Sequence, residues 1–89
     1  MQTLVGWHIE MEFREEGART TAAALLRLGD GTELRAHGSA SRHPSDPDQL
    51  RVGEEIAAAR ALSDLTSQLL TKAHGEIQEV SPVPTHPLT

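Results

Sequence analysis

The sequence lacks cysteine and tyrosine, and it has one tryptophan and one phenylalanine among 89 residues. The absence of cysteine excludes disulfides, thiolate metal sites and cysteine nucleophiles, and it suits a reducing cytoplasm. The longest apolar run covers only residues 22–26, far short of the roughly 20 residues of a membrane helix. The first residues show no basic segment followed by an apolar stretch, so we expect no signal peptide. Together these absences predict a small cytoplasmic protein with no membrane segment.

Large apolar side chains are scarce as well. Leu, Ile, Val and Phe account for 19 of the 89 residues, whereas alanine alone accounts for 11. The length allows one small domain. The 13 acidic and 8 basic residues give a net charge of −5, which argues against nucleic acid because binding to phosphates needs an excess of Lys and Arg. The composition therefore predicts one domain with a small core and no basic surface.

The clearest local pattern is an alternation of period two from Trp7 to Phe13, where apolar residues alternate with His8, Glu10 and Glu12. Such an alternation predicts a half-buried strand. Residues 15–18 supply a turn, residues 19–28 a second strand, residues 29–31 a second turn, and residues 32–41 a third strand. Gly31 occupies the last position of a three-residue hairpin loop, which commonly adopts a left-handed conformation. The pattern predicts an antiparallel meander of three strands.

The register of the meander follows from the two turns. A four-residue loop places Arg14 opposite Arg19, and a three-residue loop places Leu26 opposite Leu34. Both registers keep the apolar residues on one face, whereas a slip by one residue would scatter them. The first register pairs Met11 with Ala22, Ile9 with Ala24 and Trp7 with Leu26.

A long helix is predicted from about Gly53 to about Val80, with Glu54 and Glu55 in its first turn, where they compensate the helix dipole. In the preceding proline-containing segment, Asp46, Pro47 and Gln49 have the order of an N-cap, a first-turn proline and a capping-box partner, which predicts a short helical turn. A helical wheel gathers the apolar residues into one half, while Arg60, Asp64 and Gln68 fall in the polar half. The apolar half contains Ile56, Ala59, Leu62, Leu65, Leu69, Leu70, Ala73, Ile77 and Val80.

The domain is expected to span residues 1–80. Residues 81–89 contain three prolines and few apolar residues, so we expect a disordered Pro-rich tail.

Four segments together resemble a known family: the strand from Trp7 to Phe13, the turn Gly29–Gly31, the loop Arg42–Asp48 and the helix segment Gly53–Leu65. They are similar to the actinobacterial domain of unknown function 1876, over roughly residues 5 to 80. The resemblance implies a fold like that of the double-stranded-RNA-binding domain, here α+β in the order β-β-β-α and without the first helix. It implies no activity, cofactor or catalytic residue.

The fold label alone does not imply RNA binding, because one fold hosts unrelated functions. Double-stranded-RNA binders present lysines at the start of the final helix, where they meet phosphates. This sequence has Glu54 and Glu55 there, which carry the wrong charge. Nucleic-acid binding is therefore kept as the alternative function and is disfavoured by the acidic charge.

Metal binding and catalysis find little support. His8 and His37 lie on the outer face of the predicted sheet, with Glu10 level with His37. Two strand spacings, about 9.6 Å, separate Glu10 from His37, which is too far for one shared ion. His43 with Asp46 and Asp48 forms a weak cluster, which leaves a metal-dependent enzyme as a third hypothesis. The sequence shows no nucleophile elbow, phosphate loop or zinc-protease motif, so we expect no catalytic residue, no cofactor and no metal.

The predicted helix has an apolar arc about 180° wide, which is wider than a three-stranded sheet can cover. Small domains without disulfides or metals often complete their cores by oligomerisation. We therefore predict a non-enzymatic homo-oligomeric module that binds a partner protein or a small ligand. The interface candidates are Leu25, Leu65, Leu69, Leu70 and Ile77.

Overall fold

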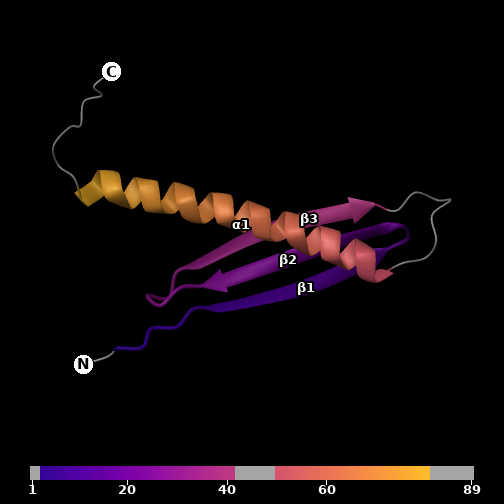
Figure 1. The fold of residues 1–89 in the computed structure, drawn as a ribbon, viewed down its shortest axis with the longest axis horizontal. Helices are drawn as coiled ribbons and strands as arrows, with labels where there is room; N and C mark the ends of the chain where they lie inside the picture. Colours follow the sequence, from indigo (N-terminus) through magenta and orange to yellow (C-terminus); the bar gives the residue numbers. More distant parts are fainter. Residues whose placement is uncertain (1–2, 42–49, 81–89) are drawn as a thin grey trace, which may run out of the picture.

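Three strands and one helix make up the fold of the residues that the structure describes. In the computed structural model these are β1 (His8–Glu16), β2 (Arg19–Arg27), β3 (Glu33–Ser41) and α1 (Leu50–Val80). The strands form an antiparallel sheet in the order β1-β2-β3. Figure 1 shows α1 lying diagonally across one face of this sheet, with its last turns extending past the ends of the strands. The predicted α+β architecture, a meander followed by one long helix, is confirmed.

The structure describes residues 3–41 and 50–80. The predicted helical turn around Asp46, the cluster of His43 with Asp46 and Asp48, and the predicted disorder of residues 81–89 lie outside these residues. Within the described residues, the structure contains no helix with the length and hydrophobicity of a transmembrane segment.

The hairpin between β1 and β2 is tighter than predicted. Glu16 lies opposite Arg19, so the loop consists of Gly17 and Ala18 alone. The predicted pairing of Arg14 with Arg19 is wrong by two residues. Gly17 has a φ of +59°, and glycine at the first central position suits the two-residue turns that match the twist of the strands. A shift by two residues keeps every side chain on its predicted face, with Ile9 opposite Leu26 and Met11 opposite Ala24.

The hairpin between β2 and β3 has the predicted register, with Leu26 opposite Leu34. Gly31 has a φ of +90°, which confirms its left-handed conformation. The Leu28 amide donates to the Thr32 carbonyl at 2.8 Å. Asp30 Oδ1 accepts a hydrogen bond from the Thr32 amide at 2.9 Å, and this bond lowers the pKa of the Asp30 carboxyl.

Alanine dominates the core between the sheet and α1. Six alanines and three leucines are buried, and they come from β2, β3, the turn after β2 and α1. Small side chains allow the helix backbone to lie close to the strands: a β carbon at Gly38 of β3 would lie 2.5 Å from the carbonyl oxygen of Ala57. The buried apolar residues in the described part of the chain are Ala22, Ala24, Leu26, Leu28, Ala36, Ala40, Ala57, Ala61 and Leu65.

The helix differs from its prediction in two ways. It begins at Leu50, so Glu54 and Glu55 lie in its second turn and not in its first. Ala57 and Ala61 face the sheet and are fully buried, although the predicted apolar arc contains neither. Much of that arc is turned away from the sheet, because close backbone packing selects the smallest side chains. The large exposed members are Ile56, Leu62, Leu70 and Ile77, at 40% to 60%.

Candidate interaction surface

The helix covers only part of the sheet. It packs against β3 and β2, and the apolar side chains on the same face of β1 stay largely uncovered. Trp7, just before β1, is 58% exposed, Ile9 is 48% exposed and Phe13 is 40% exposed. Met11 between them is half-buried against the core. We call Trp7, Ile9 and Phe13 the β1 apolar row.

Three polar side chains of α1 fix the helix to the outer edge of β3. Arg60 Nη1 donates to the Ser39 carbonyl oxygen at 2.7 Å. Asp64 Oδ2 accepts a hydrogen bond from the His37 amide at 3.3 Å, and Gln68 Nε2 donates one to the Arg35 carbonyl oxygen at 2.7 Å. These contacts hold the helix over β3 and occupy three of the backbone groups at that edge.

The sequence placed Arg60, Asp64 and Gln68 in the polar half of the wheel, and the structure leaves Arg60 and Asp64 exposed. The sequence analysis did not predict that all three side chains also contact the backbone of β3. They recur every four residues, so they form one stripe along α1. The stripe meets alternate residues of β3, whose backbone groups point outward. The signal available in the sequence was this spacing of hydrogen-bonding side chains beside the small residues Ala57 and Ala61.

The outer edge of β1 is open by comparison. Hydrogen-bonded and non-hydrogen-bonded residue pairs alternate along an antiparallel ladder. Since Leu28 and Thr32 form a hydrogen-bonded pair, the even-numbered residues of β2 direct their backbone groups toward β3. The odd-numbered residues of β2 then bond to β1, at His8, Glu10, Glu12, Arg14 and Glu16. The backbone groups of Ile9, Met11 and Phe13 consequently point to the outer edge. In the described part of the chain, no strand pairs with this edge.

The predicted interface candidates lie in three different environments. Leu65 is 4% exposed in the core, and Leu69 packs half-buried beside it. Leu70 and Ile77 are 56% and 60% exposed on the side of α1 that faces away from the sheet. Leu25 is half-buried on the opposite face of the sheet. Of these five predicted candidates, Leu70 and Ile77 are therefore the two with a large exposed apolar surface.

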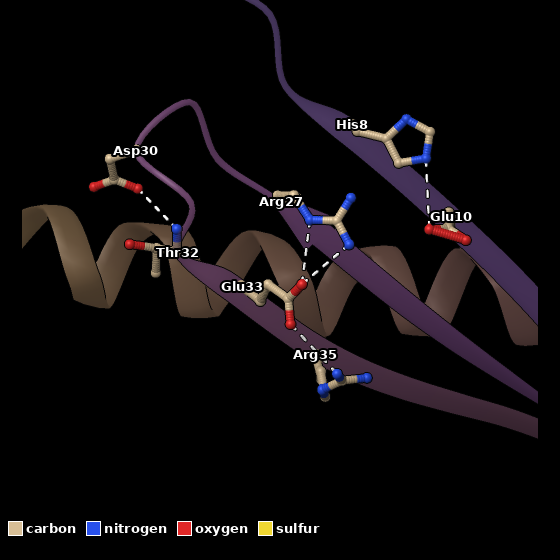
Figure 2. A network of polar contacts seen from close by, with 7 residues as sticks. All are labelled: His8, Glu10, Arg27, Asp30, Thr32, Glu33 and Arg35. Atoms are coloured by element: carbon tan, nitrogen blue, oxygen red, sulfur yellow. Dashed lines mark hydrogen bonds and ion pairs between the residues drawn. The ribbon is translucent and has the colours of Figure 1, made fainter.

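The face of the sheet opposite the helix carries charged side chains (Figure 2). Arg27 Nε and Nη2 donate to Glu33 Oε2 at 3.2 and 3.1 Å. Arg35 Nη2 lies 3.4 Å from Glu33 Oε1, and His8 Nε2 lies 3.6 Å from Glu10 Oε1. All these side chains are substantially exposed, so the pairs orient one another and contribute little to stability.

A shallow hollow of about 210 Å³ lies on this face, over Ala23 and Leu25. Glu12 is level with Ala23 and His37, so the predicted pairing of Glu10 with His37 is wrong by the same two residues as the hairpin. Glu12 and His37 remain two strand spacings apart, about 9.6 Å. Among residues 3–41 and 50–80, no group of three His, Asp or Glu could hold a metal ion.

Comparison with known proteins places this arrangement among relatives of unknown function. The Rv2632c-like family matches residues 5–86. The uncharacterized protein Rv2632c of Mycobacterium tuberculosis is 36% identical over 70 residues, which are 79% of this chain and 74% of that protein. The uncharacterized protein Mb1767 of Mycobacterium bovis is 33% identical over 78 residues, 88% of this chain and 82% of the relative. The crystal structure of Rv2632c has a TM-score of 0.83 and 31% identity, covering 93% of this chain and 98% of its own.

Proposed function

The chain belongs to the Rv2632c-like family, and we propose that it is a self-associating, non-enzymatic module that binds protein partners through its exposed apolar surface. The observation that carries the proposal is the exposure of the β1 apolar row on the same face of the sheet as the core. Strand alternation normally directs such residues into the interior. Here they lie on the helix side of the sheet but stay exposed to solvent, because α1 covers β2 and β3 and leaves β1 uncovered.

The free energy available from burying these exposed apolar side chains supports binding to a partner. Burial of a large apolar side chain contributes about 1.5–3 kcal/mol, and the row has three such side chains. Among residues 3–41 and 50–80, the buried apolar side chains are six alanines and three leucines. A domain of this size without disulfides gains stability by association, and clustered exposed apolar residues mark interaction sites more often than isolated ones do.

Other features set the class of partner. Glu54 and Glu55 are acidic residues of the second turn of α1, and the net charge of the chain is −5, which favours a protein over a nucleic acid as the partner. The proposed likeness to the double-stranded-RNA-binding fold is accordingly a likeness of architecture and not of ligand. We also propose a cytoplasmic location, on the ground that the sequence contains no cysteine.

The test is the molar mass of the purified chain by light scattering and sedimentation at 1 to 100 μM. We expect an oligomer, and we expect Ile9→Lys to shift the mass toward that of the monomer. Leu4→Lys is the matched control, because Leu4 is 93% exposed and lies before β1; its mass should stay that of the wild type. A wild-type chain that remains monomeric at 100 μM would overturn the self-association.

A further inference from the structure

We infer that the first partner of β1 is a second copy of this chain, which pairs antiparallel with it, β1 to β1, with Glu12 opposite Glu12. The inference rests on the proposed self-association and adds its geometry. It joins two three-stranded sheets into one sheet of six strands, with both helices on the same face.

The choice of β1 follows from the difference between the two sheet edges. Arg60, Asp64 and Gln68 occupy three outward backbone groups of β3, namely the Ser39 and Arg35 carbonyl oxygens and the His37 amide. A strand pairing along this edge would have to displace these three contacts. β1 has nine residues, contains no proline, and directs the backbone of Ile9 and Phe13 outward. An edge of this kind is a template for another strand.

The alternation of backbone groups limits the possible registers. Only the odd-numbered residues of β1 point their amides and carbonyls to the open edge, so an odd-numbered residue must meet an odd-numbered residue of the second copy. A two-fold axis then passes through the position of one residue. The candidates are the registers centred on Met11, Glu12 or Phe13, which differ by steps of two residues in the pairing.

Charge complementarity selects among these registers. Centred on Glu12, the pairing places Glu10 opposite Arg14 twice, with one Glu12–Glu12 contact. Centred on Met11, it places Glu10 opposite Glu12 twice. Centred on Phe13, it gains Glu12–Arg14 pairs but places Glu10 opposite Glu16 twice. Opposite charges facing each other across two strands stabilise the pair, whereas like charges destabilise it, so the register centred on Glu12 is favoured.

The same register also joins the apolar residues on the helix face. It places Met11 of each copy opposite Phe13 of the other, so the two β1 apolar rows become neighbours. Backbone pairing of a single strand buries less than the roughly 800 Å² per partner of a stable interface. The exposed areas of Ile9 and Phe13 supply apolar contact beyond the strands themselves.

The absence of cysteine allows a direct test by single-cysteine crosslinking. In the inferred register Glu12 is a non-hydrogen-bonded pair with a Cα separation of about 4.5 Å, within the range of a disulfide. Glu10 and its copy would lie about 14 Å apart, because four residues separate them along the strand. We expect Glu12→Cys to form a disulfide dimer under mild oxidation at least tenfold faster than the matched control Glu10→Cys.

A charge exchange tests the same register without oxidation. Glu10→Arg and Arg14→Glu should each weaken the dimer about tenfold, and the double variant should return the dissociation constant to near that of the wild type. Faster crosslinking at position 10, equal rates, or no recovery in the double variant would overturn this register. A chain that associates but shows these results retains the proposed function, whereas a monomeric chain overturns both.

Discussion

Gly38 of β3 lies directly against the backbone of Ala61 in α1. A β carbon at Gly38 would overlap the Ala61 amide nitrogen, and it would lie 2.5 Å from the Ala57 carbonyl oxygen and 2.7 Å from the Arg60 carbonyl carbon. These atoms are helix backbone and cannot rotate away. The position of the helix over β3 therefore depends on the absence of a side chain at this residue.

Gly38→Ala should destabilise the chain by about 1–3 kcal/mol or more, because α1 must move away from β3 to admit the methyl group. The free energy of unfolding from urea titration measures the effect. Gly75→Ala is the control, since a β carbon at Gly75 meets nothing within 4 Å. That change in the same helix should stabilise it by up to about 1 kcal/mol. Equal stability of the wild type and Gly38→Ala would contradict the close contact.

Asp64→Ala should uncover part of the β3 edge. The His37 amide loses its acceptor, which costs about 0.5–1 kcal/mol at this exposed site. Hydrogen exchange of the His37 amide should accelerate relative to amides of β2. Ser67→Ala in the same helix serves as the control and should leave that amide unchanged. Unaltered protection of His37 in the Asp64 variant would show that the contact does not cover the edge.

Asp30→Asn should change how stability depends on pH. The Thr32 amide bond lowers the pKa of Asp30 from the ordinary value of 3.8, so the ionised carboxylate favours the folded state. This contribution is present above pH 3.8 and is lost as the pH falls through the lower pKa of the folded state. Wild type should therefore exceed Asp30→Asn in stability at pH 7, and the difference should shrink at pH 2 to 3. Urea titrations at both pH values check this, and a constant difference would argue against it.

Gly17→Ala should destabilise the first hairpin by about 1 kcal/mol, because Gly17 has a φ of +59°, which L-residues adopt at a cost of 1–2 kcal/mol. Gly17→Asn should cost less, since asparagine tolerates this conformation better than alanine does. Thermal denaturation of the three proteins gives the order. A midpoint for Gly17→Ala at or above that of Gly17→Asn would not fit the turn.

The order of the elements was readable from the sequence because glycines mark both turns and alternation marks β1. Gly29, Asp30 and Gly31 determined the second register correctly. The first register was wrong by two residues, since Glu15 and Glu16 looked like turn residues but continue the strand to its end. Polar residues at a strand end satisfy both descriptions, and only the conformation of Gly17 decides between them.

The face of α1 that packs against the sheet was harder to predict from the sequence than the order of the elements. A helical wheel that groups the large apolar side chains predicts that Ile56 and Leu62 face the sheet. In the structure Ala57 and Ala61 face the sheet instead. Contact between backbones rewards small side chains, and this preference depends on Gly38, which lies in another element. The roles of Asp64 and Gln68 were missed for the same reason, because their partners are backbone atoms of β3 that no side-chain pattern reveals.

The covering of one sheet edge by α1 also sets a limit on stoichiometry. A sheet that can accept a strand at just one of its edges has one site for association with another sheet. Two such sheets that meet through β1 use both of their open sides, and the outer strands of the product are the two β3 strands, each carrying its own helix contacts. An assembly of the inferred kind would end at two chains, whereas a sheet with two open edges could extend into a fibre.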